Sequence, residues 1–271
     1  MALQDHKQAI NRVFLIFLVL CVLCFALFSC VSYIESETTG YVDMDTVTLV
    51  QLDEPEDDAP AFCMHTTVGD IVAELYPDEA PAYVEQFTTL AEEGYYDNTY
   101  IFQVESEVYF EGGSPNSDGS TDTDEYENVE LELSGDLWPF RGAFCAPIMS
   151  QEGNIWERLT GDTTSYVGSC FVVCDTIEFD DDTIEEMEEV SDTAQEVTDA
   201  FLELGGIPNY SQQMTIFAQA YGEESLETID AITEAEVGSE SGENAYTAPV
   251  EDIMITSIEI GVYSDFVSDE S

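Results

Sequence analysis

The segment 69–81, GDIVAELYPDEAP, constrains the fold more than any other stretch because it places a strand directly before a helix. Ile71, Ala73 and Leu75 alternate with more exposed positions, which is typical of a half-buried strand. Asp78 can then cap a helix, and Pro81 falls in the first turn, where its missing N–H costs nothing. The segment therefore predicts a strand that ends near residue 75 and a helix over 79–93, which Gly94 ends.

Short apolar runs between turn-forming residues predict a mainly β fold for the rest of the globular part. A strand pair is expected over 62–75, and two short strands over 100–110. Further strands are expected at 143–146, 168–173, 214–218 and 249–262, the last with a bulge near Ser257. With a last helix around Ile229, this predicts a closed antiparallel β-barrel capped by two helices. Closure suits a solitary domain because it leaves no sheet edge.

Residues 183–204 interrupt this strand pattern with apolar residues three and four apart. Thr183 and Glu186 form a capping box before the run, and Gly205 and Gly206 follow it. The pattern predicts an inserted amphipathic helix of about twenty residues. We expect its apolar side to pack on its own domain.

The chain divides into four parts by composition. Residues 1–30 are a signal or anchor segment, and 31–58 an acidic tether with a possible short strand at 47–52. Residues 59–262 form the globular domain, with its insertion at 183–206, and 263–271 an acidic tail.

Acidic residues dominate the charge of the chain. There are 4 Lys and Arg against 59 Asp and Glu, for a formal net charge of -55. Long-range repulsion therefore excludes nucleic acid as a partner. Adaptation to high salt, recognition of cationic partners, a merely solvated surface and recoding of basic residues all remain open as explanations.

The apolar run over 13–31 follows Lys7 and Arg12, as in export signals. It ends Leu27-Phe28-Ser29-Cys30, which resembles a bacterial lipoprotein signal that is cut before an acylated Cys30. An uncleaved anchor is the second interpretation, because about 19 apolar residues can span a bilayer. Plain secretion is the third. Each places the rest of the chain outside the cytoplasm, and the first two attach it to a membrane.

Four cysteines lie in the globular part: Cys63, Cys145, Cys170 and Cys174. Cys170 and Cys174 share a predicted strand and would lie roughly 13 Å apart, too far for a disulfide. We predict buried free thiols, with a Cys145–Cys170 disulfide as the alternative if their strands are neighbours. Since the globular part has no CxxC pair and His65 is the one histidine after the export segment, no metal site and no cofactor are predicted. His65 is expected to be structural.

Four separated segments carry a resemblance to a known family. They are 66–96, then IFQVESEVYFEGGSP at 101–115, then Arg141-Gly142 with GSCFVV at 168–173, and finally MTIF at 214–217 with the closing strand. In order and spacing they resemble the cyclophilin-type peptidyl-prolyl cis-trans isomerases over roughly residues 60–262. The resemblance implies a barrel of about eight strands with a proline-binding groove on its outer face.

Matched residue by residue, the family's catalytic arginine falls at Gln103. The other positions that the resemblance assigns to substrate binding also differ from the family pattern. They are Phe102, Val108, Tyr109, Glu111, Ala146, Pro147, Cys170, Val172, Asn209, Tyr210 and Met214. The scaffold glycines are kept, whereas the side chains of the groove are not.

Three functions follow from this pattern. The first is an exported isomerase that assists protein folding, with a degraded site and weak activity, because Gln103 lacks a guanidinium. The second is a non-catalytic module that holds proline-containing or basic peptide segments, with Glu111 in its groove. The third is a surface lipoprotein that only occupies the envelope. For all three we expect a monomer, and for the first two an unfolded or proline-containing peptide partner.

Overall fold

The computed structural model describes residues 47–121, 126–155, 158, 163–177, 179, 184, 195–238 and 247–267. These fall into two compact units. The smaller unit contains the described residues among 152–163, and the larger unit contains those of 47–151 and 164–267. The predicted export segment, with Cys30 and most of the tether, lies outside the described residues. So do much of the predicted inserted helix and the end of the acidic tail.

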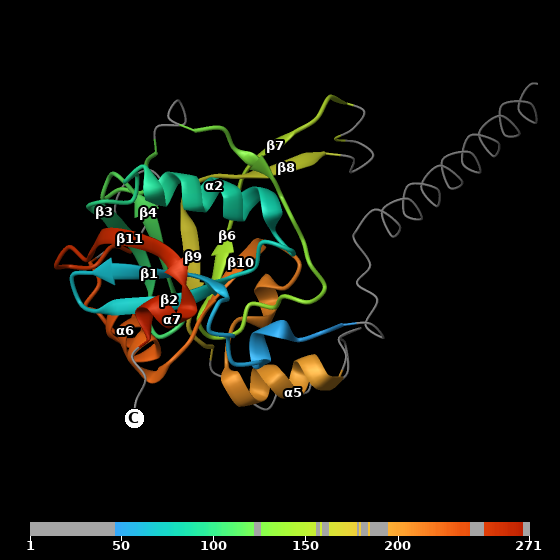
Figure 1. Ribbon diagram of the computed structural model, residues 1–271. Coiled ribbons are helices and arrows are strands. Elements are labelled where there is room, and N and C mark those ends of the chain that lie inside the picture. The colour runs from blue at the N-terminus through green and yellow to red at the C-terminus, as the bar shows by residue number, and fades with distance from the viewer. Residues whose placement is uncertain are drawn as a thin grey trace, which may run out of the picture. The chain divides into compact units, whose positions relative to one another are not determined.

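The larger unit is built on a closed eight-stranded barrel in the order β1-β11-β3-β4-β9-β6-β10-β2 (Figure 1). Neighbouring strands within it pair antiparallel. The strands are β1 Pro60–Thr66, β2 Asp70–Leu75, β3 Thr99–Glu105, β4 Tyr109–Ser114, β6 Ala143–Ala146, β9 Phe171–Cys174, β10 Thr215–Ala220 and β11 Met254–Val262. The mainly β fold, the strand number and the closure are confirmed.

Aromatic rings fill the barrel. Phe62, Phe144, Phe171 and Phe217 come from four different strands and are fully buried. Their ring centroids lie 5.2 to 6.4 Å apart, in tilted or edge-to-face arrangements that aromatic pairs prefer. We call the buried residues packed around these rings the interior cluster.

Two helices cover the ends of the barrel. In Figure 1, α2 (Pro81–Glu92) crosses one end and α6 (Glu223–Thr233) lies at the other. Phe87 of α2 packs on Phe62 and Phe217, and Ile229 and Ile232 of α6 join the interior cluster. Each helix thus buries one apolar face against the strands.

The start of α2 differs from the sequence prediction. Its N-cap is Ala80, not Asp78, and no capping side chain from the helix itself bonds there. Instead the carboxylate of Glu132 accepts hydrogen bonds from the backbone N–H groups of Ala82 and Tyr83, at 3.1 and 2.9 Å. A negative charge at this end also complements the helix dipole. A distant residue therefore replaces the local cap.

Smaller elements surround the barrel. A separate three-stranded sheet has the order β5-β8-β7, from Val129–Glu130, Thr164–Val167 and Ile148–Glu152. Short helical turns occupy Val50–Leu52, Pro208–Tyr210 and Tyr263–Phe266 (α7). The first of these corrects the predicted strand at 47–52, because the backbone bonds there close turns of a 3-10 helix. Within the described ranges, no helix has the length and apolar composition needed to cross a bilayer.

The described part of the inserted helix is α5, Gln195–Leu204. Val197, Ala200 and Phe201 are buried against Trp138 and Phe140, as expected for packing on its own domain. Gly205 and Gly206 end it with φ of 84° and 129°, a region that side chains strongly disfavour. A Cβ on Gly206 would lie 2.4 Å from the carbonyl oxygen of Pro139, so only glycine allows this close approach.

Candidate active site on the outer face of the barrel

Alternate residues of the barrel strands form a second apolar cluster on the outer face. In β9, Phe171 and Val173 point into the interior cluster, whereas Val172 and Cys174 point the other way. In β6, Phe144 and Cys145 divide in the same manner. The outer-face cluster comprises Tyr76, Leu137, Ala143, Cys145, Val172, Cys174, Ile207 and Ile216, with Val50, Val108, Tyr109, Ile177, Tyr210 and Met214 packed against it.

The register of the strands aligns five residues in one row across this face. Gln103 of β3 lies opposite Glu111 of β4, and Glu111 lies opposite Val172 of β9. Val172 faces Cys145 of β6, and Cys145 faces Ile216 of β10. Directly opposed side chains on neighbouring strands lie about 4.5–5.5 Å apart at Cβ. The row therefore places one amide and one carboxyl group beside the apolar side chains of Val172, Cys145 and Ile216.

Gln103 donates a hydrogen bond through Nε2 to the hydroxyl of Tyr109 at 2.7 Å. The ring of Tyr109 packs edge-to-face on Tyr210, with centroids 5.9 Å apart. Tyr210 in turn hydrogen bonds to Tyr109. Burial is the main reason why the pKa of Tyr210 is raised above its ordinary value. The half-buried amide of Gln103 is thus held in place, and an amide nitrogen carries a second hydrogen that this contact does not use.

Glu111 is the carboxyl group within the row. Burial alone raises its pKa to about 7, because an apolar setting disfavours the charged form. Near neutral pH the group therefore exists as both the acid and the carboxylate. It can donate a hydrogen bond in the first form and attract a cationic group in the second.

The cysteines on this side of the barrel are buried free thiols. Cys145 and Cys174 place their sulfur atoms 3.8 Å apart. Cys145 thus lies beside Cys174 and not beside Cys170, which the sequence had offered as its alternative partner. Burial foremost, with the charge of Glu111, raises the pKa of Cys170 to about 12, so this thiol stays protonated.

Other predicted binding residues lie in different settings. Val108, Tyr109, Val172, Tyr210 and Met214 meet in the outer-face cluster. Phe102 is buried, and Asn209 is exposed in the turn Pro208–Tyr210. Pro147 is half-buried directly after β6. The side chain of Ala146 packs in the interior cluster, so only its backbone could meet a ligand on the outer face.

Arg141 stands near the start of β6 and is fixed by carboxylates. Its Nε donates to Asp175 at 3.0 Å, and its Nη2 donates to Asp230. Asp175 also accepts a hydrogen bond from Thr233 and follows Cys174 directly. Burial lowers the pKa of Arg141, but the two carboxylates more than offset this. The guanidinium is therefore engaged in an ion cluster and does not belong to the row.

Sequence reasoning missed several residues of the outer-face cluster. Cys145 and Ile216 complete the row, and Leu137 and Ile207 approach from loops. The strand alternation around Phe144 and Phe217 could have identified the first two, because neighbours of an interior residue point outward. Nothing local marks the loop residues. A cavity of about 380 Å³ beside α2 and another of about 470 Å³ beside Tyr221 contain none of the predicted site residues.

A separate group could hold a metal ion. Cys63, His65 and Asp70 bring a sulfur, a nitrogen and an oxygen atom within 4.8 Å of one another. These residues lie on β1 and at the start of β2, which are separated from β4 and β9 in the barrel order by other strands on either side. The group is therefore not part of the row described above.

Comparison with known proteins identifies relatives. Residues 61–172 match the family model described as cyclophilin type peptidyl-prolyl cis-trans isomerase/CLD. A Staphylococcus epidermidis protein, provisionally described as a peptidyl-prolyl cis-trans isomerase, is 28% identical over 76% of this chain and 94% of its own length. A Streptococcus pyogenes protein, provisionally described as a bifunctional phosphatase and isomerase, is 28% identical over 83% of this chain but only 43% of its own length.

The Cryptosporidium parvum cyclophilin type isomerase, determined in the presence of the dipeptide Ala-Pro, is 18% identical and has a TM-score of 0.49. The alignment covers 74% of this chain and 98% of that one. The family model covers the barrel from β1 into β9, which is the first part of the stretch 60–262 that carries the resemblance in sequence. This chain is therefore similar to the cyclophilin-type peptidyl-prolyl cis-trans isomerases, over residues 61–172 by the family model and over a longer stretch by its relatives.

Proposed function

We propose that this protein is a weakly active prolyl isomerase that acts outside the cytoplasm on proline-containing segments of other proteins. The observation that carries the proposal is the row from Gln103 to Ile216. The resemblance in sequence assigns the family's arginine position to Gln103, so a neutral amide would take its place. An apolar floor lies beside it. The row thus retains a hydrogen-bond donor and apolar side chains that would meet a proline ring, but no positive charge.

The chemistry needs no covalent step. Rotation about a prolyl bond has a barrier of about 18–20 kcal/mol, because the amide loses its resonance at the twisted midpoint. An enzyme lowers this barrier by binding the twisted amide better than the planar one. The apolar residues of the outer-face cluster would hold the proline ring, while Gln103 would donate its unused N–H to the substrate.

Gln103 is a poorer donor than an arginine for two reasons. It has no charge, and it lacks the planar fork of a guanidinium. One of its hydrogens is also engaged by Tyr109. Loss of a preorganised donor typically costs about 10²–10³ in rate. We therefore infer activity well below that of a family member with the arginine.

The test is a proline-isomerisation assay on a tetrapeptide with the wild-type protein and Gln103→Arg. The wild type should accelerate the reaction only slightly, and Gln103→Arg should raise kcat/KM by about 10². Gln195→Arg, at an exposed position in α5, introduces the same charge elsewhere and should change nothing. A wild-type rate equal to that of arginine-containing relatives would show that the site is not degraded.

A second function is a binding module without catalysis, and Glu111 is the observation that favours it. Its carboxyl group stands in the apolar row and becomes charged near neutral pH. A carboxylate there would select peptides with a basic residue beside the proline. Titration with a cationic and a neutral proline peptide should show tighter binding of the first, and Glu111→Gln should abolish the difference. Equal affinity of the wild type for both peptides would exclude this selection.

The proposed site of action rests on the N-terminal sequence. Lys7 and Arg12 precede the apolar run over 13–31, and Leu27 lies three residues before Cys30. We propose that Cys30 is lipidated and anchors the mature chain to a membrane, with an uncleaved anchor as the alternative. The mass of the N-terminal peptide from the membrane fraction separates them. A lipid on Cys30 supports the first, and an intact residue 1–30 segment supports the second.

A further inference from the structure

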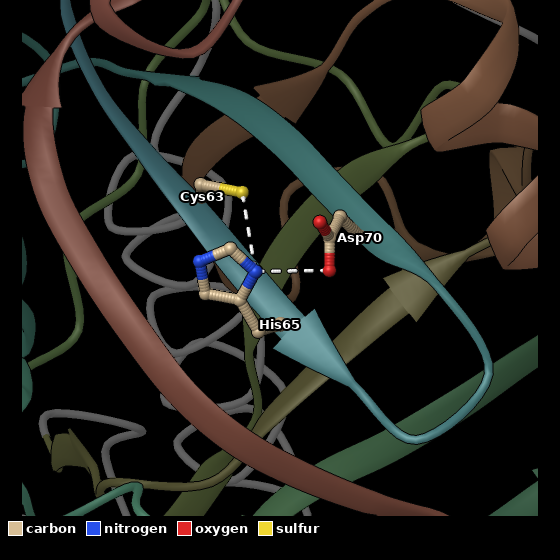
Figure 2. Close-up of side chains that lie close together, drawn as sticks. All are labelled: Cys63, His65 and Asp70. Carbon is tan, nitrogen blue, oxygen red and sulfur yellow. Dashed lines mark hydrogen bonds and ion pairs between the residues drawn. The ribbon is translucent and has the colours of Figure 1, made fainter.

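Three side chains of different chemical type converge on the outer face of the β1–β2 hairpin (Figure 2). Cys63 and His65 are two residues apart on β1 and so share a face of the strand. Met64, which lies between them, and Phe62, which precedes Cys63, point into the interior cluster. Asp70 lies directly opposite His65 in the register of β2. Strand alternation and pairing thus bring the three groups together.

Both contacts in this group use the same nitrogen of the imidazole, as Figure 2 shows. His65 Nδ1 lies 2.9 Å from Asp70 Oδ1 and 3.9 Å from Cys63 Sγ. A ring nitrogen has either one hydrogen to donate or one lone pair to accept with. It therefore cannot satisfy the sulfur and the oxygen equally by hydrogen bonding. A cation placed among the three atoms would be bound by all of them.

The spacing suits a small divalent cation. Zinc binds sulfur at about 2.3 Å and nitrogen or oxygen at about 2.0–2.2 Å, which separates neighbouring ligands by about 3.3–3.6 Å in a tetrahedron. The observed separations of 3.9 and 2.9 Å each depart from this by about half an ångström or less. Side-chain rotation alone can supply that adjustment.

The second ring nitrogen of His65 faces another carboxylate. Nε2 lies 3.8 Å from Oε1 of Glu259 on β11, the residue in register with Cys63. Histidines that bind a metal commonly direct their other N–H toward a carboxylate, which orients the ring and fixes the tautomer. Glu259 is placed for that role, and this leaves Nδ1 for a metal.

A catalytic use of Cys63 fits the structure less well. A nucleophilic cysteine needs access to substrate and a lowered pKa. Cys63 is only 5% exposed. Burial first, and then the charges of Asp70 and Glu259, raise its pKa to about 11. The sulfur is thus a buried thiol that does not suit nucleophilic catalysis.

We propose that Cys63, His65 and Asp70 bind a zinc-type divalent cation, with the fourth position open to water. A thiolate, an imidazole and a carboxylate together are typical ligands for zinc, whereas calcium and magnesium prefer oxygen alone. The side chains of His65 and Asp70 are 30% and 60% exposed, so a cation can enter from solvent. The net charge of -55 raises the local concentration of cations. On binding, the cation takes the place of the thiol proton, which is released to solvent.

The sequence pointed away from this site. Its globular part contains no CxxC pair, and His65 is the one histidine after the export segment. Two of the ligands lie on the same face of one strand, and the third lies on the strand paired with it. The spacing of residues along the chain does not reveal this pairing. The proposal is independent of the isomerase function, because the hairpin and the row lie on different strands.

The experiment is a competition titration of the full chain with Zn²⁺ against a chromophoric chelator, in excess Mg²⁺ to occupy unspecific acidic sites. The wild type should bind one equivalent. Cys63→Ser and His65→Gln should each weaken binding by about 10²-fold or more, and Glu259→Gln by about 10-fold. With Co²⁺ the wild type should show a thiolate-to-cobalt charge-transfer absorption that Cys63→Ser lacks.

Matched controls separate this site from general acidity and from misfolding. Asp70→Asn should weaken binding, whereas Asp78→Asn, beyond the opposite end of β2, should not. Cys170→Ser removes another buried thiol and should bind as the wild type does. Circular dichroism verifies the fold of each variant. If Cys63→Ser does not fold, His65→Gln tests the site instead, because the side chain of His65 is partly exposed. Binding unaffected by Cys63→Ser and His65→Gln would overturn the proposal.

Discussion

The interior and the outer face of the barrel are built from the same strands but differ in composition. The interior cluster is closed by fully buried aromatic rings from β1, β6, β9 and β10. The outer-face cluster combines smaller apolar side chains with Gln103, Tyr109 and Glu111. In β9 the change occurs between adjacent residues, since Phe171 is interior and Val172 is outer. Because side chains alternate along a strand, one short strand packs the stabilising core with one face and contributes to the candidate site with the other.

The largest effect should come from truncating the interior. Phe217→Ala removes a ring that packs against Tyr83, Phe87, Phe144 and Phe171, and should lower the free energy of unfolding by about 3–5 kcal/mol. Met214→Ala, only partly buried in the outer-face cluster, should cost less than half of this. Denaturant titration measures both. Equal losses would mean that the two clusters contribute alike to stability.

The ion cluster at one end of the outer face gives the next test. Asp175 has a side chain only 7% exposed, and Arg141 is the cation beside it. Burial raises the pKa of Asp175, and the hydrogen bond from Thr233 and the charge of Arg141 offset only part of that rise. Arg141→Gln should therefore destabilise the fold by about 3 kcal/mol, because a buried carboxylate loses its partner.

The control for Arg141 is Arg158→Gln, which removes the same charge from the other unit. Arg158 donates through Nε to the carbonyl oxygen of Gly153, an exposed contact. Its loss should change the unfolding free energy by less than about 0.5 kcal/mol. If both variants were equally destabilised, net charge and not the buried ion cluster would be responsible.

Glu111 should make stability depend on pH. Its pKa rises from 4.5 to about 7 on folding, so the native state keeps a proton that the unfolded chain loses between these values. This contribution to stability is present below about pH 4.5 and is lost as pH rises through 7. Glu111→Gln should therefore be more stable than the wild type by about 1–2 kcal/mol above pH 7, allowing for partial exposure.

The measurement is a series of denaturant titrations of Glu111→Gln and the wild type between pH 4.5 and 8. The advantage of the variant should grow with pH and level off above 7. Glu130→Gln in β5, an exposed position, should show no such growth. If Glu111→Gln were more stable than the wild type by the same amount at every pH, folding would not raise the pKa of the Glu111 carboxyl group.

The smallest effect should come from the hydroxyl of Tyr109. Tyr109→Phe removes the acceptor for Gln103 Nε2 and for Tyr210 while keeping the ring contact. The cost should be about 1 kcal/mol, which is typical of a hydrogen bond at a partly exposed site. Tyr100→Phe, outside this network, is the comparison and should cost less. Identical unfolding curves for wild type and Tyr109→Phe would mean that this contact does not stabilise Gln103.

Local pattern was sufficient for the barrel strands and α2, but not for the 3-10 turn Val50–Leu52 or for the separate sheet β5-β8-β7. The alternation of Ile71, Ala73 and Leu75 gave β2, and Pro81 and Gly94 marked the two ends of α2. The bulge predicted near Ser257 occurs where β1 and β11 shift register. The cap of α2 was misplaced because Glu132, distant in sequence, supplies it. A local signal cannot show a partner that folding brings from elsewhere.

The sequence by itself determined the period of each strand, the closed barrel through family resemblance, and the amide at position 103, because these depend on residue order alone. Only the tertiary structure decided which residues stand beside Gln103, that Cys145 meets Cys174, and that Cys63, His65 and Asp70 converge. Those contacts depend on strand register and barrel closure. Both are set by pairing between segments far apart in the chain. The spacing of residues within each segment does not predict which segments pair or in which register.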